Sequence, residues 1–147
     1  MLQEQAAKKN QNIGRSRGGL TSKIHALCDA LGNPLKFVVT AGQVSDFTQA
    51  EALLENVDGQ YVLADKGYDS NTIVEAIESI GAEAVIPPRA SRKVQREYDA
   101  ELYKERNLVE RLFNKMKHFR RLATRYEKLS VNFESFIYFV WAWIWSK

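Results

Sequence analysis

Segments with strand and helix periodicity alternate along the chain, and this alternation limits the folds that it can adopt. Apolar residues recur at every second position in Thr21–Ala30 and Leu35–Thr40, with a Gly-Asn-Pro turn between them, which predicts a β-hairpin. The next predicted elements are a helix through Leu54 with Asp46 as its N-cap and a strand at Tyr61–Ala64. They are followed by a helix at Asn71–Ile80 that ends at Gly81, a strand at Ala84–Ile86 and a helix from about Ala100. This order predicts an α/β fold with a mixed sheet flanked by helices.

Four polar residues share one stripe of the helix predicted from Ala100. At about 100° per residue, Tyr103, Arg106, Glu110 and Lys117 fall within roughly 60° of one another. An adjoining arc is apolar and is predicted to face the core, with Leu102, Leu108, Val109, Leu112, Phe113, Met116 and Phe119. The stripe therefore lies where a helix can carry a carboxylate site, although ion pairs on a solvated surface would give the same pattern.

A second carboxylate, Asp65, directly follows the strand predicted at Tyr61–Ala64. Strand ends collect catalytic groups in α/β proteins, but Asp, Gly and Ser are also common turn residues, so both interpretations stay open for this segment. Paired with Glu110, Asp65 suits a hard cation such as Mg²⁺, which prefers oxygen ligands. Arg106 and Lys117 would then bind phosphates, and Tyr103 could hydrogen-bond to a base or stack on it.

Composition excludes several other kinds of site. Cys28 is the only cysteine and the chain has two histidines, so a disulfide or a His/Cys metal centre is not expected and any metal would be held by carboxylates. We interpret His25 as a structural or substrate-channel residue. The first residues have no signal-peptide core, and Phe136–Trp145 is too short to span a bilayer. These features predict a cytoplasmic protein without a membrane partner.

The apolar C-terminal run predicts a buried helix that begins near Asn132. Its three tryptophans, Trp141, Trp143 and Trp145, have apolar neighbours. We therefore interpret them as core or subunit-contact residues rather than as a platform for base stacking.

Positive charge is concentrated in a few segments although the formal net charge is only +3. Residues 1–19 predict a flexible basic lead-in with Arg15 and Arg17, and residues 88–100 predict a mobile basic loop. A third segment contains Arg106, Arg111, Lys115, Lys117, Arg120, Arg121, Arg125 and Lys128. Such clustering indicates a polyanion partner, while a solvated helix face is the alternative.

Several motifs together resemble the DDE transposases of the IS4/IS5 insertion-sequence group, most closely the IS5 family. They are Gly14-Arg-Ser-Arg-Gly-Gly-Leu-Thr-Ser-Lys-Ile-His25, Leu31-Gly-Asn-Pro-Leu35, Leu63-Ala-Asp-Lys-Gly-Tyr-Asp-Ser70 and Tyr-x2-Arg-x3-Glu-x6-Lys, present as Tyr103, Arg106, Glu110 and Lys117. The resemblance implies an RNase H-like fold in which Asp65 and Glu110 are the second and third acids of a catalytic triad that binds Mg²⁺ or Mn²⁺. From their charge and positions we expect DNA contacts by Tyr103, Arg106, Lys117, Arg15, Arg17, Arg120 and Arg121. For Lys66, beside Asp65, a phosphate contact and a position in solvent both stay open.

The first acid of that triad has no match in this sequence. In the family it lies on a central strand upstream of the basic lead-in, so we expect residues 20–147 to form a partial RNase H-like domain, incomplete at its N-terminus. Unpaired edges of the sheet would then favour pairing with an upstream transposase segment or with a second copy of the chain. A frameshift product and a truncated remnant fit this expectation equally well.

Three functional hypotheses follow. The first is the C-terminal portion of an insertion-sequence transposase, which acts on terminal inverted repeats and target DNA by metal-dependent strand cleavage and transfer, and which is inactive as this chain alone. The second is a catalytically inactive DNA-binding or regulatory fragment. The third, an RNase H-like nuclease without a role in transposition, is less favoured because Arg106 and Lys117 fit strand transfer better.

Overall fold

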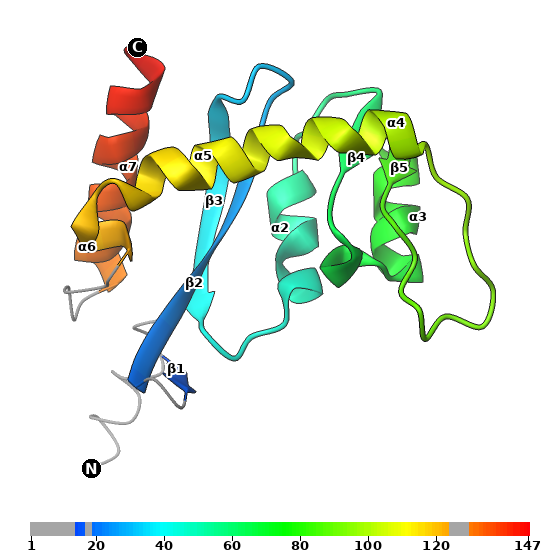
Figure 1. The fold of residues 1–147 in the computed structure, drawn as a ribbon, viewed down its shortest axis with the longest axis horizontal. Helices are drawn as coiled ribbons and strands as arrows, with labels where there is room; N and C mark the ends of the chain where they lie inside the picture. Colours follow the sequence, from blue (N-terminus) through cyan, green and yellow to red (C-terminus); the bar gives the residue numbers. More distant parts are fainter. Residues whose placement is uncertain (1–13, 17–18, 124–129) are drawn as a thin grey trace. The chain divides into compact units, whose positions relative to one another are not determined.

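The computed structural model describes residues 14–16, 19–123 and 130–147, which Figure 1 shows as a ribbon. The chain divides into two compact units. Unit 1 comprises Met1–Val44 and Val109–Lys147, and unit 2 comprises Ser45–Leu108.

Unit 1 contains the predicted hairpin. Its strands, in the spatial order β1-β2-β3 and all antiparallel, are β1 (Gly14–Ser16), β2 (Gly19–Cys28) and β3 (Pro34–Ala41). The turn between β2 and β3 has Gly32 at φ 83°, a conformation that glycine adopts without steric cost. The hairpin prediction is confirmed. Residues 14–16 and 19, predicted as part of the lead-in, belong to these strands.

In its described residues, unit 1 also contains the helices α5 (Asn107–Lys117), whose first two residues belong to unit 2, α6 (Arg120–Ala123) and α7 (Ser130–Trp145). Together with β3 they enclose an apolar core formed by Val39, Leu112, Met116, Phe133, Ile137, Val140, Trp141 and Ile144. The alternate hydrophobic residues Ile24, Ala26 and Cys28 of β2 pack against this core. The apolar side of β2 therefore faces this core. The predicted C-terminal helix is confirmed, although it includes Ser130 and so begins before Asn132.

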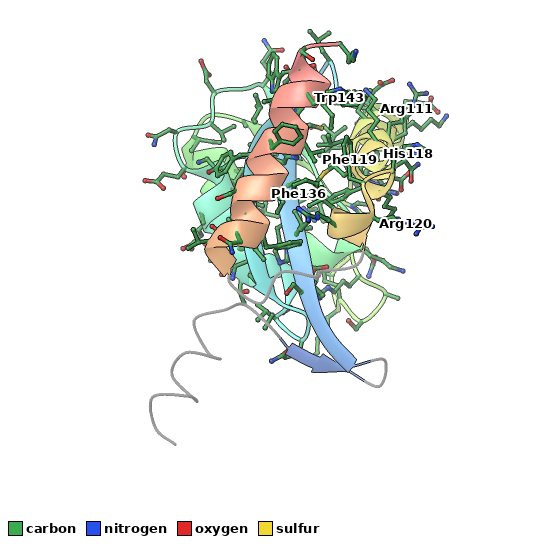
Figure 2. All side chains as sticks on the ribbon, turned by 90° about the vertical axis from the view of Figure 1, so that its left-hand side faces the viewer. Arg111, His118, Phe119, Arg120, Phe136 and Trp143 are labelled. Atoms are coloured by element: carbon green, nitrogen blue, oxygen red, sulfur yellow. The ribbon has the colours of Figure 1, made fainter. Side chains whose placement is uncertain are left out.

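Aromatic rings extend this packing along α7 (Figure 2). The Phe119 ring lies with its centroid 6.3 Å from that of Phe136 and 5.5 Å from that of Trp143, in edge-on geometries. Trp141 is buried as predicted, but Trp143 and Trp145 are 46% and 54% exposed. A single helix can turn only part of its circumference toward one core, so an almost entirely apolar helix leaves some aromatic residues outside it.

Unit 2 is built around a parallel strand pair. Its elements are η1 (Asp46–Gln49), α2 (Ala50–Leu54), β4 (Tyr61–Leu63), η2 (Lys66–Tyr68), α3 (Asn71–Ser79), β5 (Glu83–Val85), α4 (Ala100–Tyr103) and η3 (Lys104–Arg106), where η marks a 3₁₀ turn. Strands β4 and β5 pair in parallel and α3 connects them, which makes a β-α-β unit. Its core consists of Ala50, Leu54, Ile73, Ile77, Ala82 and Ile86.

The predicted strands form two small sheets rather than one mixed sheet. Among the described residues, β2 pairs with β1 on one side and with β3 on the other, and β4 pairs with β5. The α/β class is therefore confirmed, whereas a single sheet is not present in this part of the chain. Alternating hydrophobicity identifies strands, but it does not say which strands become neighbours.

Two local predictions were wrong. Asp46 is the first residue of the 3₁₀ turn η1 and not the N-cap of α2, whose N-cap is Gln49. The helix predicted from Ala100 is interrupted by the 3₁₀ turn η3, so a constant 100° per residue does not hold between Tyr103 and Glu110. The stripe assumed in the sequence is therefore not one regular helical face.

Candidate active site at the Asp65 turn

Asp65 occupies a turn immediately after β4. It is the N-cap of η2, and its Oδ1 accepts a hydrogen bond of 2.7 Å from the Gly67 backbone N–H. A Cβ atom at position 67 would lie 2.8 Å from that oxygen, so any residue other than glycine would force the Asp65 carboxylate to shift. The turn interpretation and the catalytic interpretation of Asp65 are thus compatible. The hydrogen bond fixes one carboxylate oxygen, and the other remains to bind a ligand.

Asp46 provides a second carboxylate beside the same glycine. Its Oδ2 would lie 3.3 Å from a Cβ atom at Gly67, so the Asp46 and Asp65 side chains both approach this residue. Burial and then the charges of Asp46 and Asp65 raise the pKa of Tyr68 to about 12. The Tyr68 hydroxyl therefore stays protonated near neutral pH. This carboxylate pair was not predicted from the sequence, because its members are 19 positions apart.

Tyr103 and Arg106 belong to the same unit and contact each other. The Arg106 guanidinium lies 5.3 Å from the centre of the Tyr103 ring, and the Tyr98 ring meets the Tyr103 ring edge-on at 5.7 Å. Burial raises the pKa of Tyr103, the Arg106 charge opposes that shift, and the Asp65 charge adds to it. Unit 2 therefore brings Asp65, Tyr103 and Arg106 into one electrostatic environment, and Tyr103 is a hydrogen-bond donor at neutral pH.

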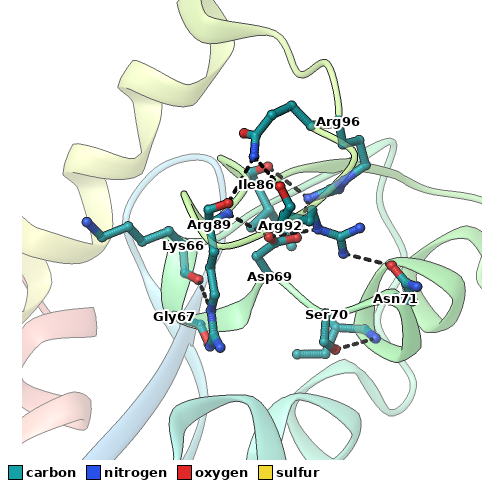
Figure 3. A network of polar contacts seen from close by, with 11 residues as sticks. Lys66, Gly67, Asp69, Ser70, Asn71, Ile86, Arg89, Arg92 and Arg96 are labelled. Carbon is teal, nitrogen blue, oxygen red and sulfur yellow. Dashed lines mark hydrogen bonds and ion pairs between the residues drawn. The ribbon is translucent and has the colours of Figure 1, made fainter.

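A buried carboxylate, Asp69, organises the segment that follows this turn (Figure 3). Its Oδ2 accepts hydrogen bonds from the Arg89 backbone N–H at 2.7 Å and from Arg92 Nε at 3.0 Å. Its Oδ1 accepts one from Arg96 Nη2 at 2.9 Å. Burial alone would raise the pKa of Asp69, but these hydrogen bonds and the charges of Arg92 and Arg96 lower it. Asp69 is thus an anionic anchor.

The three arginines come from the basic loop predicted at residues 88–100. We call the segment between β5 and α4, residues 86–99, the arginine loop. Arg89 also reaches the Asp65 turn: its Nε donates to the Lys66 carbonyl at 3.0 Å and its Nη2 to the Gly67 carbonyl at 2.6 Å. The loop is therefore anchored to the turn by several hydrogen bonds, contrary to the prediction of a mobile segment. The sequence contained one indication that the loop would be anchored, namely the three arginines that follow Pro87-Pro88.

Apart from Lys66, the remaining predicted site residues lie in unit 1 or outside the described residues. Glu110 is exposed in the first turn of α5, and Lys117 is seven residues further along the same helix. Arg120 and Arg121 are exposed on α6, and the Arg121 guanidinium lies 5.6 Å from the Phe136 ring centre. In Figure 2 the Arg111, His118 and Arg120 side chains point outward from these helices. The α5–α6 segment therefore presents an exposed basic surface.

The other predicted contacts are placed as follows. Lys66 is exposed beside Asp65. Arg15 lies in β1, and its backbone is paired with that of Leu20 in β2. Arg17 lies outside the described residues. His25 is buried in unit 1, with Nε2 2.8 Å from Thr40 Oγ1. A buried ring in contact with a neighbouring strand fits the structural interpretation of His25.

The chemistry of the donors at the Asp65 turn fits a hard divalent cation. The side-chain donors of Asp65 and Asp46 are oxygen atoms, and Mg²⁺ and Mn²⁺ prefer such ligands. Within the described ranges, no three side chains of His, Cys, Asp or Glu form a group that could hold a metal ion. The turn thus has suitable donors for part of a coordination shell.

The α/β architecture and the carboxylate at a strand end fit a DDE transposase domain, the class of protein that the sequence motifs indicate. A family model described as "Transposase DDE domain" matches residues 2–145, and the chain belongs to this family. Transposase DDE domains generally use divalent metal ions.

Two relatives narrow the class to insertion-sequence transposases. A protein named as a transposase for insertion sequence element IS6501, from Brucella ovis, is 39% identical over 128 residues, which are 86% of this chain and 98% of that protein. One named for element IS402, from Burkholderia cepacia, is 35% identical over 126 residues, which are 78% of this chain and 56% of that protein. No solved structure matches the chain. None of the helices in the described part is long and apolar enough to cross a bilayer.

Proposed function

We propose that Asp65 and Glu110 are catalytic carboxylates of an IS5-type transposase that cuts and joins DNA strands at the ends of its insertion sequence. The observation that carries the proposal is the fixed Asp65 side chain at the end of β4. Its Oδ1 is held by the Gly67 amide, and Tyr103 and Arg106 belong to its electrostatic environment. Carboxylates held in this way bind divalent ions without a large reorganisation.

Each side chain has a distinct role in this proposal. Asp65 and Glu110 would hold Mg²⁺ or Mn²⁺, which when bound activates a water or a 3′-hydroxyl and stabilises the leaving oxygen. Arg106 lies over the Tyr103 ring and would bind a phosphate next to the scissile bond. Tyr103, protonated at neutral pH, would donate a hydrogen bond to a phosphate oxygen. Lys117, Lys66, Arg120 and Arg121 would contact the strand further away, as Arg15 and Arg17 would.

We further propose that the complete enzyme adds a first aspartate on a strand that pairs beside β4. Among the described residues β4 pairs only with β5, so an edge of β4 remains to accept another strand. The source of that strand is an upstream transposase segment or a second copy of the chain. The substrate is DNA with the terminal inverted repeats of the element, together with target DNA.

The decisive experiment measures cleavage of DNA that carries the element's ends, in Mg²⁺ or Mn²⁺, by a protein extended upstream to include that strand. Asp65→Asn and Glu110→Gln should each reduce cleavage by at least about a hundredfold, because each removes a charged metal ligand. Asp58→Asn and Glu78→Gln are matched controls, since both acids are exposed and lie outside the proposed site. Cleavage that survives the Asp65 or Glu110 substitution would refute the catalytic assignment.

A regulatory, catalytically inactive DNA-binding fragment is the second candidate. The exposed cations of α5 and α6 favour it, because they need no complete acidic triad to bind DNA. In the same assay this candidate predicts that the 147-residue chain binds the ends without cleaving them and inhibits the extended protein. Cleavage by the 147-residue chain itself would contradict this candidate and the need for an upstream strand.

A further inference from the structure

A pocket lies between the arginine loop and the start of α3. It has a volume of about 330 Å³ and is lined by Asp69, Asn71, Arg89, Ser91 and Arg92. Figure 3 shows that Arg92 and Asn71 face each other, with Arg92 Nη2 donating to Asn71 Oδ1 at 2.7 Å. None of these residues belongs to the acidic triad or to the predicted DNA contacts.

The charge around the pocket favours an anion. Two guanidinium groups, those of Arg92 and Arg96, pair with a single carboxylate, Asp69, whose side chain is only 1% exposed. The backbone N–H of Arg89 bonds the same carboxylate, while the Arg89 guanidinium bonds two backbone carbonyls and keeps its charge without an acidic partner there. The carboxylate is therefore neutralised and shielded, while the Arg92 side chain remains 23% exposed. Arg92 uses Nε and Nη2 for Asp69 and Asn71, and a guanidinium has five N–H donors in a planar fork. Neither of these two hydrogen bonds uses the Nη1 group, which can donate to a ligand.

The start of α3 adds a second attractive element. Asn71 is the first residue of this nine-residue helix, and the Ser70 hydroxyl caps the Ile73 N–H at 3.1 Å. The first backbone N–H groups of a helix carry partial positive charge and attract anions. The pocket therefore combines an arginine held in a fixed orientation, the hydroxyl-bearing residue Ser91 and a helix N-terminus.

We propose that this pocket binds a phosphate group of the DNA backbone. The inference rests on the proposed function, because DNA is the polyanion that a transposase handles. Arg89 links the pocket to the Asp65 turn through the Lys66 and Gly67 carbonyls. A strand held at the pocket is thereby fixed relative to the proposed metal ligand, and this fixation positions the scissile phosphate.

The test is Asn71→Asp in the 147-residue chain. The new carboxylate still accepts the hydrogen bond from Arg92 and is favourable at a helix N-terminus, so the fold is retained. It also places a negative charge in the pocket. Binding to a fluorescent DNA duplex, measured in EDTA over a series of KCl concentrations, should weaken severalfold, and the salt slope should fall by about one.

Gln60→Glu is the matched control, because it makes the same amide-to-carboxylate change at an exposed position of unit 2 away from the pocket. Thermal unfolding verifies that both variants fold. If Asn71→Asp and Gln60→Glu bind DNA equally well with the same salt slope, the proposal is overturned. Inorganic phosphate is tested separately by calorimetry. Phosphate binding that Asn71→Asp abolishes, with DNA affinity unchanged, would assign the pocket to free phosphate and overturn the DNA assignment.

The two proposals fail in different ways. Asp65→Asn is expected to abolish cleavage by the extended protein but to leave binding at the pocket intact. A pocket that does not bind DNA would leave the catalytic assignment standing. Cleavage that survives Asp65→Asn would refute the catalytic assignment even if Asn71→Asp weakens DNA binding as predicted.

Discussion

The two units of this protein are stabilised in different ways. Unit 1 buries large apolar side chains, among them Phe133 and Ile137 of the 16-residue helix α7 and Met116 of α5. Unit 2 has a smaller core of alanine, isoleucine and leucine and adds a buried carboxylate with three arginines around it. Apolar packing is non-directional, whereas hydrogen bonds fix orientations. The unit that presents Asp65 is therefore the one in which polar geometry is specified most closely.

The largest expected effect is on unit 1. Phe133 is 2% exposed in the core, and Phe133→Ala should lower the free energy of unfolding of unit 1 by about 4 kcal/mol, because it leaves a cavity. Val131→Ala, at a position 72% exposed on the same helix, should change it by less than about 0.5 kcal/mol. Hydrogen exchange measured by mass spectrometry reports each unit separately. Equal loss of protection in both units would mean that they unfold together, and the comparison would fail.

A somewhat smaller effect is expected in unit 2. Asp69→Ala leaves Arg92 and Arg96 without their carboxylate partner and should cost about 3 kcal/mol. The loss of protection should be concentrated in the arginine loop and α3. Glu75→Ala, an exposed change on α3, is the control. Unchanged exchange in the arginine loop would show that apolar packing holds unit 2 as it does unit 1.

The smallest expected effect is a response to acid. The pKa of Asp69 is lowered below its ordinary value of 3.8, so its contribution to stability is present above that value and is lost as pH falls through the lower, folded-state pKa. Protection of the arginine loop should therefore decrease below about pH 4, and Asp69→Asn should remove this dependence. Asp29→Asn is the control, because Asp29 in unit 1 also has a lowered pKa. An unaltered acid response in Asp69→Asn would assign it to another group.

The sequence predicted the elements that depend on neighbouring residues. The hairpin turn with Gly32, the end of β4 before Asp65 and the helix α3 with Gly81 after it were all correct, because each is set by local conformational preference. The 3₁₀ turn at Lys104–Arg106 was missed, since hydrophobic spacing does not distinguish one helix from two helices joined by a tighter turn. The assignment of Asp65 and Glu110 as catalytic residues stays a prediction.

The sequence alone determined the alternation of strands and helices, the apolar face of β2, the position of Asp65 at a strand end and the motifs that indicate a DDE transposase. Only the tertiary structure placed Asp46 beside the Asp65 turn, gathered the arginines around Asp69 and formed the pocket at the start of α3. The physical reason is the separation along the sequence over which each effect acts. Periodicity and turn chemistry act over a few residues, whereas these polar contacts join residues about 20 positions apart, whose meeting depends on how the intervening elements pack.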